Sequence, residues 1–449
     1  MKKLMLICAP VTSRSGYGSH ARDLTHAFIK HDKYDVKIMD VPWGDCPRDA
    51  LNKNNENDKI LLDCVLAEPK VDRQPDVYVD IRIPNEFQQY GKFNIGITAG
   101  IETTAVSNVW IEGCNKMDLI IVPSEHSKGG FVHALYEKMQ QGPDGKQKKI
   151  GELKLEKPIE VLFEGADEDI YKPIENASLD LVDDIKEDFC FLHIGQWTKG
   201  GYGEDRKDIA KMIKIFYESF ANKEKQPALI LKTNGAGFSI LDREDCLAKI
   251  KDVKSRFPSD WNLPNVYLLH GTLSEKEINK LYNHPKVKAF VSLTHGEGFG
   301  RPLLEATMTG LPVIATNWSG HLDFLSDSDS MLLGGELKQV PKSLVWKDII
   351  IPESQWFNVN ETQAYKSLNY SFQNYDEVKK KAINLMKVNR EKFTLNKMTE
   401  QLDEIISPII NKLPSQVGIK LPTLKKVGGS EPPKIKLPKL KKVTDEASV

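Results

Sequence analysis

The sequence has no strong imbalance of charge and contains few cysteines. Its 449 residues carry 62 Lys and Arg against 63 Asp and Glu, a formal net charge of −1. This balance provides no overall attraction to nucleic acid or to a membrane surface. The cysteines lie far apart without the spacing of a metal site, which indicates free thiols in a reducing cytoplasm: Cys8, Cys46, Cys64, Cys114, Cys190 and Cys246.

Long hydrophobic runs are also missing. No stretch approaches the about 20 apolar residues that a membrane-spanning helix needs, so no transmembrane segment is expected. The first residues, MKKLMLICAPVTSRSG, combine a basic pair with an apolar run, as a secretory signal does. That run is short and passes directly into a glycine turn. We therefore expect it to form the first buried strand of a cytoplasmic protein.

What the sequence does have is a glycine-rich stretch, THGEGFGRPLLEATMTGLPVIATNWSG. The apolar, β-branched run VKAFVSL before it predicts a buried strand. Gly296, Gly298 and Gly300 then form a turn, and Pro302 fits the first position of a helix, where its missing N–H costs nothing. Gly310 ends that helix, and LPVIAT begins another strand. The stretch therefore predicts a strand, a glycine loop, a helix and a strand.

This loop has the chemistry of a ligand site. Free N–H groups at a helix start point toward the carboxyl end of the strand, and glycine lets a ligand approach the backbone. We place Glu297 in the loop and Glu305 in the first helical turn, with both carboxylates facing the same crevice. Carboxylates accept hydrogen bonds from hydroxyl groups and repel phosphate, which favours a polyhydroxy ligand. The alternative is that Glu305 only caps the helix and Glu297 is solvated.

The run EGFGRPLLEATMTGLPVIAT resembles the donor-binding signature of retaining glycosyltransferases of family 4. The resemblance implies an α/β protein of GT-B fold, with two Rossmann-like doubly wound domains facing a cleft and a C-terminal crossover helix. It implies that Glu297 contacts the donor sugar and that Glu305 binds the ribose hydroxyls. The backbone of Gly298, Phe299 and Gly300 would approach the sugar and the phosphates.

The rest of the chain fits two such halves, because its length exceeds the about 250 to 300 residues at which one core stops growing. Near the N-terminus, Gly16 and Gly18 lie in a predicted loop between a strand and a helix and offer further backbone donors to the nucleotide sugar. DFCFLHIGQW starts the second half. We expect a Rossmann-like acceptor domain at 1–175, a Rossmann-like donor domain at 188–395, a crossover helix at 396–411 and a flexible Lys/Pro-rich tail at 412–449.

Basic residues are predicted beside the donor. Arg206 and Lys207 stand at the start of a helix, and the resemblance places the lysine on the diphosphate, where positive charge stabilises the leaving group. Lys232 ends a predicted strand nearby, and Ser319 and Gly320 could add contacts to sugar or phosphate. With these charges a metal ion is unnecessary, so we predict metal-independent chemistry and no cofactor. The substrate would be a nucleoside-diphosphate sugar such as a UDP- or GDP-sugar.

The acceptor side is less defined by the sequence. GITAGIETT places Glu102 beyond a strand end, across from the donor, but the histidine that many family members have near this region is missing. A catalytic role and a helix cap both remain open for Glu102. A glycan, a modified DNA base and a protein remain open as acceptors. The tail repeats IKLPTLKKV as IKLPKLKKV, and serves either as a solvated linker or as a docking arm for an acidic partner.

The leading hypothesis is a retaining glycosyltransferase that moves a sugar from a nucleoside-diphosphate sugar to an acceptor hydroxyl. CAPVTSRSGYGSHARD and the tail also resemble glycosyltransferases of large tailed bacteriophages, which would place the protein in the host cytoplasm. One alternative is a non-hydrolysing nucleotide-sugar epimerase on the same fold. The other is a catalytically inactive sugar-nucleotide-binding protein.

Overall fold

The structure is a computed structural model that describes residues 2–141, 146–198, 202–235 and 237–413. Residues Met1–Leu413 form one compact unit. The predicted basic tail begins at 412, so from 414 onward it lies outside the described residues.

The N-terminal half is built on a sheet of six parallel strands, counted within the described residues, in the order β2-β1-β3-β4-β5-β8. Four of the strands are buried along nearly their whole length, whereas Tyr34–Asp40 is partly exposed and Ile159–Val161 has one buried residue. The strands are β1 (Lys3–Ala9), β2 (Tyr34–Asp40), β3 (Val77–Ile81), β4 (Phe93–Ile97), β5 (Leu119–Val122) and β8 (Ile159–Val161).

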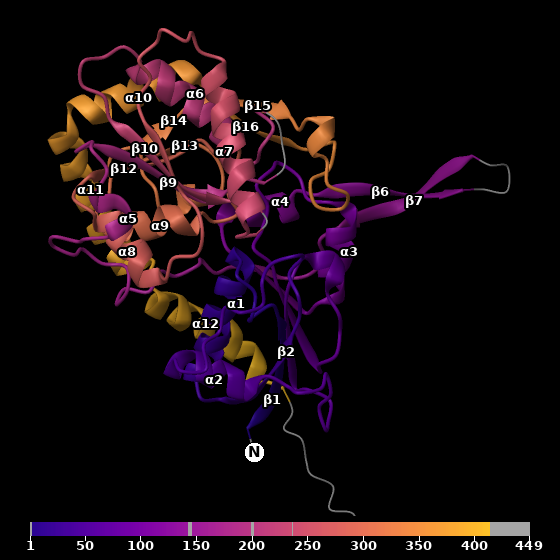
Figure 1. The fold of residues 1–449 in the computed structure, drawn as a ribbon. Helices are drawn as coiled ribbons and strands as arrows, with labels where there is room; N and C mark the ends of the chain where they lie inside the picture. The colour runs from indigo at the N-terminus through magenta and orange to yellow at the C-terminus, as the bar shows by residue number, and fades with distance from the viewer. Residues whose placement is uncertain (1, 142–145, 199–201, 236, 414–449) are drawn as a thin grey trace, which may run out of the picture. The chain divides into compact units, whose positions relative to one another are not determined.

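Helices cover both faces of this sheet (Figure 1). Residues of α1 (Gly16–Lys30) share one core with β1, β2 and β3, whereas residues of α3 (Asn108–Lys116) belong to the core on the opposite face. The remaining helical segments of this half are α2 (Glu56–Cys64), α4 (Glu125–Val132) and the 3₁₀ turn η1 (Pro84–Glu86).

The C-terminal half has the same architecture as the N-terminal half. Its described residues form a second sheet of six parallel strands in the order β11-β10-β9-β12-β13-β14. The strands are β9 (Cys190–Gln196), β10 (Ala228–Asn234), β11 (Val266–Leu269), β12 (Val287–Ser292), β13 (Val313–Thr316) and β14 (Met331–Leu333). The helical segments are α5 (Asp180–Asp183), α6 (Ile209–Phe220), α7 (Ile240–Ser255), α8 (Glu275–Asn283), α9 (Arg301–Met308), α10 (Glu361–Gln373), α11 (Tyr375–Lys392), η2 (Gly320–Asp323) and η3 (Lys342–Leu344). The predicted pair of Rossmann-like halves is confirmed.

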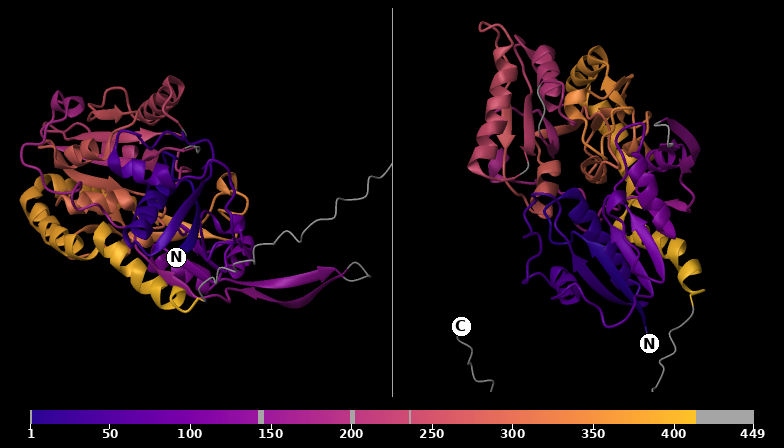
Figure 2. Two further views of the ribbon diagram at one scale, coloured as in Figure 1. Left: turned by 90° about the horizontal axis from the view of Figure 1, so that it is seen from below. Right: turned by 90° about the vertical axis from the view of Figure 1, so that its right-hand side faces the viewer.

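The last helix, α12 (Leu395–Ile410), returns to the first half, as predicted for a crossover helix. It contributes Met398, Leu402, Ile406 and Ile410 to the same core as β1 and α1. Lys33, before β2, donates to Asp403 of α12 at 2.5 Å. In Figures 1 and 2 the yellow α12 lies beside the indigo helix α1. The first core is therefore completed by the final described helix.

Two strand pairs were not predicted. β6 (Leu135–Gln141) and β7 (Gln147–Lys154) form an antiparallel hairpin that projects from the N-terminal half (Figure 2). β15 (Gly335–Gln339) and β16 (Gln355–Val359) form a second antiparallel pair. Most residues of β6, β7 and β15 are exposed, so these strands lack the alternation of apolar and polar residues that a half-buried strand shows. The helix α7 was missed as well.

Some local expectations are corrected. Gly16 and Gly18 lie in the first turn of α1 and not in a loop before it, because Ser15 caps the helix by accepting a hydrogen bond from the Gly18 N–H. Helix α9 begins one residue earlier than expected, which moves Pro302 to its second position and Glu305 to its second turn.

Two expectations hold within the described chain. All six cysteines are described and are free, as predicted. No helix among the described residues is both long and apolar enough to cross a membrane.

We predict that Leu402→Ala lowers the free energy of unfolding by about 2 to 5 kcal/mol, because it opens a cavity in the core that α12 shares with the first sheet. The exposed neighbour Glu404→Ala is the matched control and should change it by less than about 0.5 kcal/mol. Denaturant unfolding measures both values. Equal effects of the two substitutions would mean that α12 contributes little to that core.

Candidate functional site

The glycine loop after β12 is held in place by its neighbour after β13. The Glu297 N–H donates to Ser319 Oγ at 2.8 Å, and the Gly320 N–H donates to the Glu297 carbonyl at 2.9 Å. Gly300 has φ of +98°, a left-handed conformation that favours glycine, and it precedes α9. The predicted donor residues Ser319 and Gly320 therefore lie directly against the loop that carries Glu297.

The same loop touches the N-terminal half. A Cβ on Gly296 would lie 2.1 Å from the Glu102 carbonyl oxygen, and one on Gly298 would lie 2.0 Å from that of Ala99. Ser124 Oγ donates to the Gly298 carbonyl at 2.6 Å. We expected these glycines to admit a ligand. In this structure the missing side chains of these glycines leave room for the backbone of residues 99–102, which allows close contact between the two halves.

Lys207 and Glu297 form an ion pair at the centre of the site. Lys207 Nζ contacts both carboxylate oxygens of Glu297, at 2.6 and 2.7 Å, and each side chain is 16% exposed. Burial by itself would raise the pKa of Glu297, but the charge and hydrogen bonds of Lys207 outweigh burial and lower it. Glu297 is therefore a carboxylate at neutral pH.

Arg206 connects the two halves. Its Nε donates to Glu102 Oε2 at 2.8 Å, and its Nη2 also contacts the Glu102 carboxylate. Trp318 Nε1 donates to the Glu102 carbonyl at 3.1 Å. The helix-cap alternative for Glu102 is wrong, because the next helix begins only at Asn108 and the Glu102 carboxylate is bound to the guanidinium.

The loop that carries the two basic residues is fixed by buried polar groups. Asp205 Oδ1 accepts hydrogen bonds from the N–H groups of Lys207 and Ile209, at 3.1 and 3.2 Å. The His295 N–H donates to the Arg206 carbonyl at 3.1 Å. Helix α6 starts at Ile209 after the N-cap residue Asp208, so both Arg206 and Lys207 are held before its first turn.

Glu305 lies in a separate ionic cluster. Its carboxylate accepts from Arg301 Nε at 2.9 Å and from the Tyr282 hydroxyl at 3.3 Å. The other end of the Arg301 guanidinium contacts Asp23 of α1. Burial raises the pKa of Glu305, although Arg301 opposes that shift. The two signature glutamates thus face different cations, and Arg301 forms a second ionic link between the halves.

The remaining predicted residues have local partners. Lys232 Nζ donates to the Gly271 carbonyl at 2.7 Å, and the Phe299 ring packs in the core at 5.1 Å from that of Phe324. The Gly18 N–H is taken by Ser15 Oγ at 3.0 Å, whereas no atom lies within 4 Å of a Cβ on Gly16. Of the backbone donors predicted for α1, the one at Gly18 is therefore already used.

His193 was missed by the sequence analysis. Its Nδ1 lies 2.9 Å from the Val291 carbonyl, which can only accept, so Nδ1 carries the proton. Nε2 has no hydrogen-bond partner among the described residues and lies near Gly195 and the Lys207 side chain. Burial lowers the pKa of His193 to about 4. A neutral imidazole thus presents a lone pair beside Lys207.

His321 occupies the corresponding position beside Glu297. Its Nε2 donates to the Thr316 carbonyl at 2.6 Å, which leaves Nδ1 unprotonated, and within the described chain Nδ1 has no partner. Both His321 Cβ and Glu297 Cγ lie within 3.5 Å of a Cβ built on Gly300. Burial lowers the pKa of His321. The carbonyl that sets the His193 tautomer lies 98 residues away in the sequence, whereas the one that sets the His321 tautomer lies only five residues away. Neither contact has a motif by which the sequence analysis could have identified these histidines.

A histidine also lies near Glu102, although the segment GITAGIETT has none. His126 of α4 contacts the Trp318 ring edge-on at 4.9 Å between ring centres. Burial lowers its pKa to about 4, against a raising effect of its hydrogen bond to the Thr103 backbone. His126 lies on α4, the second helix after Glu102 in the sequence, and the fold places its side chain near the Glu102 loop.

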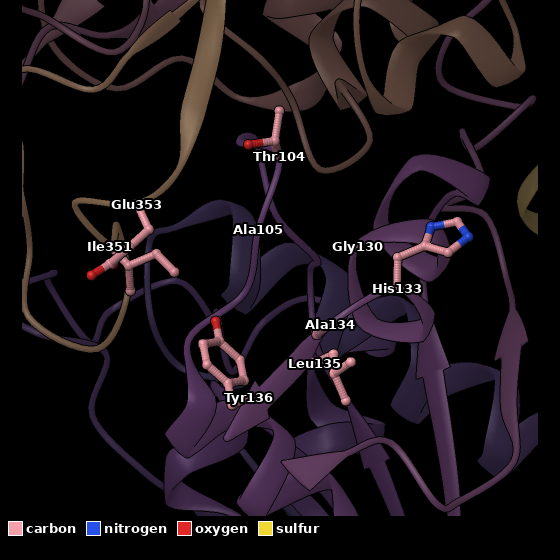
Figure 3. A pocket seen from close by; sticks show the side chains of 9 residues that line it. All are labelled: Thr104, Ala105, Gly130, His133, Ala134, Leu135, Tyr136, Ile351 and Glu353. Carbon is pink, nitrogen blue, oxygen red and sulfur yellow. The ribbon is translucent and has the colours of Figure 1, made fainter. Parts of the chain in front are cut away.

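A cavity of about 250 Å³ opens beside the Glu102 loop (Figure 3). No residue predicted for the donor or catalytic site lines it. Its walls are Thr104, Ala105, Gly130, His133, Ala134, Leu135, Tyr136, Ile351 and Glu353. Nowhere among the described residues do three His, Cys, Asp or Glu side chains come together in an arrangement that could hold a metal ion.

Comparison with known proteins gives matches to glycosyltransferases. Residues 251–336, which include the glycine loop, match the family model described as "Glycosyl transferases group 1". A 72-residue stretch is 32% identical to the 2-deoxystreptamine N-acetyl-D-glucosaminyltransferase of Niallia circulans. That match covers 16% of this chain and only 18% of the relative's length.

Solved structures resemble the chain over most of its length. The Anabaena protein HepE, solved with UDP and glucose, aligns with a TM-score of 0.56 at 14% identity, over 91% of this chain and 100% of that chain. The sucrose-phosphate synthase of Thermosynechococcus elongatus aligns with a TM-score of 0.62 at 12% identity, over 92% and 100%. The chain therefore has the GT-B fold, and the comparisons together support a glycosyltransferase.

We predict that Lys207→Met raises the pKa of Glu297, because the cation that outweighs burial is removed. Wild-type stability from the pair is present above the unfolded carboxyl pKa of about 4.3 and is lost as pH falls through the lower folded value. In the variant, stability should instead fall as pH rises toward neutrality, where an unpaired buried carboxylate costs about 3 to 5 kcal/mol.

Carbon-13 NMR titration of the Glu297 carboxyl and unfolding curves across pH measure these two effects. Lys232→Met is the matched control, since that ammonium contacts a carbonyl and not Glu297. An unchanged Glu297 titration in Lys207→Met would contradict the assigned pair.

Proposed function

We propose that this protein is a retaining glycosyltransferase of the family 4 type, which transfers a sugar from a UDP- or GDP-sugar to an acceptor hydroxyl. The observation that carries the proposal is the contact between Lys207 and Glu297, with Arg206 adjacent in the same loop. This contact joins the cation expected at the diphosphate to the carboxylate expected at the sugar. Lys207 and Glu297 would then lie on the diphosphate side and the sugar side of the bond that breaks.

The chemistry requires stabilisation of a leaving diphosphate. As the bond between the anomeric carbon and the phosphate oxygen breaks, its electron pair leaves with the diphosphate. Lys207 and Arg206 supply preorganised positive charge for that developing negative charge. Glu297, kept ionised by Lys207, accepts hydrogen bonds from sugar hydroxyls. His193 and His321 stay neutral beside the pair and add no competing positive charge.

Retention of configuration follows in our proposal from attack on the face that the diphosphate leaves. The acceptor oxygen forms the new bond to the anomeric carbon, and its proton passes to the departing phosphate oxygen. Among the predicted site residues, none is an obvious covalent nucleophile. Glu102 orients Arg206 through two hydrogen bonds. Since the two cations supply the needed charge, we propose that transfer proceeds without a metal ion.

A UDP-sugar donor is supported by the structures of HepE with UDP and with UDP-glucose, although they resemble this chain at only 14% identity. Glu305 is the residue proposed to bind the ribose hydroxyls. A carboxylate has about four lone-pair positions, and Arg301 and Tyr282 occupy part of them. The cluster around Arg301 thus orients Glu305 and leaves it acceptor capacity for a ligand.

We also propose a cellular setting for the protein. The resemblance to glycosyltransferases of tailed bacteriophages suggests a protein that acts in the host cytoplasm. A glycan, a modified DNA base and a protein are the proposed acceptor classes, and an acidic partner is proposed for the tail. An epimerase would yield an epimer of the donor without acceptor. A catalytically inactive binding protein would bind the nucleotide sugar but would not cleave it, so no free nucleotide would form.

We predict that Lys207→Ala slows nucleotide release from UDP-glucose or GDP-glucose by a factor on the order of 10² to 10³, the usual loss when one preorganised donor to developing charge is removed. The double variant with Arg206→Ala should be less impaired than the product of the two single effects, because both cations serve one diphosphate. The assay runs with EDTA present, which also tests metal independence. Wild-type rates in Lys207→Ala, or no wild-type activity until manganese is added, would overturn the mechanism.

We predict that Glu305→Ala weakens nucleotide binding by about 1.5 to 3 kcal/mol, because a charge-assisted acceptor for the ribose is lost. Calorimetry with UDP and GDP measures the affinity. The exposed Glu244→Ala on α7 is the control and should bind as the wild type does. A ribose role for Glu305 is wrong if the two variants bind nucleotide equally.

A further inference from the structure

His193 has a buried ring nitrogen that no group in the described chain uses. The side chain lies on β9, is 1% exposed, and donates from Nδ1 to the Val291 carbonyl at 2.9 Å. Its Nε2 therefore carries a lone pair, and this atom has no hydrogen-bond partner among the described residues. A buried acceptor without a partner carries the full cost of its desolvation, so its place in the site requires a physical reason.

A glycine keeps space open beside this nitrogen. Gly195 follows two positions later on the same face of β9, and a Cβ built on it would lie 2.9 Å from His193 Nε2. Its φ is not in the left-handed region, so the backbone conformation does not require glycine here. Glycine inside a strand weakens the strand and often marks a position where another group approaches closely. The missing side chain of Gly195 thus leaves room for a partner of His193.

Lys207 borders the same space. Its Cγ lies 3.7 Å from the Cβ built on Gly195, and the side chain continues from Cγ to the ammonium group. Lys207 Nζ donates to the two carboxylate oxygens of Glu297, at 2.6 and 2.7 Å. An ammonium group carries a further N–H beyond the two that these contacts use. A donor of Lys207 and an acceptor of His193 are therefore both free beside Gly195 in the described chain.

Binding of a nucleotide sugar increases the need for such a partner. In the proposed function, Glu297 uses part of its acceptor capacity for sugar hydroxyls, while Lys207 faces the diphosphate. Burial lowers the pKa of Lys207, whereas the Glu297 charge raises it. A hydrogen bond to the ammonium favours its charged form. Because burial lowers the pKa of His193 to about 4, its lone pair is available at neutral pH for that bond.

The other groups around Lys207 do not replace this acceptor. Charged and titratable groups reach Lys207 from its own loop, the donor loop, β9 and η2: Asp205, Arg206, Glu297, His193 and His321. Asp205 binds backbone N–H groups, Arg206 is itself a cation, and His321 lies beside Glu297. His193 is thus the neutral acceptor on the Lys207 side of the ion pair.

We propose that His193 is a positioning residue for Lys207: its Nε2 accepts the further N–H of the ammonium while a diphosphate is bound. The proposal rests on the glycosyltransferase function above and adds a residue that acts through Lys207. His193 itself forms no bond to the substrate. It keeps the lysine charged and holds the charge on the diphosphate side when sugar hydroxyls share Glu297.

Two substitutions separate the roles of the two ring nitrogens. His193→Asn keeps a donor to the Val291 carbonyl, because its amide nitrogen takes the position of Nδ1, but it has no acceptor at the position of Nε2. His193→Gln places an amide oxygen at the position of Nε2. With saturating UDP, we expect the pKa of the Lys207 ammonium to fall in His193→Asn and to return toward the wild-type value in His193→Gln. NMR titration of the Lys207 side chain measures this pKa.

Turnover should divide the variants in the same way. Nucleotide release from UDP-glucose or GDP-glucose should slow by about tenfold to about a hundredfold in His193→Asn, the range for one hydrogen bond to a charged group. A lysine with a lower pKa loses its proton at lower pH, so the alkaline limb of the pH–rate profile should move down. His193→Gln should recover most of the rate. Gly195→Ala fills the space beside Nε2 and should act as His193→Asn does.

His284→Asn is the matched control. This histidine is 3% exposed, but its Nε2 lies 2.8 Å from an Asp183 carboxylate oxygen, and its Nδ1 accepts from the Lys286 N–H at 3.2 Å. The substitution should leave the Lys207 pKa and the pH–rate profile unchanged, even where it lowers the free energy of unfolding. Denaturant unfolding of every variant separates lost stability from lost positioning.

A fall of the Lys207 pKa in His193→Asn that His193→Gln reverses supports the proposal. Equal losses of rate in these two variants without a change of the Lys207 pKa overturn it, because they indicate a structural role alone. If His193→Asn does not fold, Gly195→Ala decides, and a wild-type Lys207 pKa in that variant rejects the contact. Normal UDP binding with such a result leaves the donor function intact, whereas failure of the wild type to bind UDP or GDP rejects the proposed function itself.

Discussion

The buried ion pair of Lys207 and Glu297 is the interaction on which the site depends. Removing two charges from water is expensive, and their attraction compensates only when geometry is good and the remaining hydrogen bonds are made. Here Lys207 contacts both oxygens of Glu297. Ser319 binds the Glu297 N–H, and Asp205 binds that of Lys207. Each charged residue is thus fixed through its own backbone, which keeps the pair aligned.

Around this pair, the two halves meet through backbone as much as through side chains. The glycines of the donor loop approach the carbonyls of Ala99 and Glu102 more closely than any larger residue could. The ion pairs Arg206–Glu102 and Arg301–Asp23 also join the two halves. Thr104 and Gln355 extend the same contact by one main-chain hydrogen bond and one from the Gln355 N–H to the Thr104 hydroxyl. The loop that carries Glu102 is thereby coupled to the donor loop and to the cavity wall.

Much of the fold could be predicted, because parallel strands buried on both faces leave continuous apolar runs such as VKAFVSL and DLIIVPS. The glycine loop followed from its glycines and Pro302, whereas the roles expected of Lys207 and Glu297 came from the resemblance to a family. The bond between Arg206 and Glu102 joins residues 104 positions apart, and nothing local encodes it. His193 and His321 could not be recognised from the sequence because hydrogen bonds to main-chain carbonyls set their orientation and tautomer. The β6–β7 hairpin was missed because its exposed strands carry no burial pattern.

The return of α12 has a consequence for how the protein is made. Met398, Leu402, Ile406 and Ile410 fill the core whose first strand begins at Lys3. A ribosome delivers these residues only after the entire second half has emerged. Until then the nascent first half exposes the apolar surface that α12 will cover, and exposed apolar surface favours aggregation. The second half, whose core contains no residue of α12, can fold during synthesis, while the first half is completed only near its end.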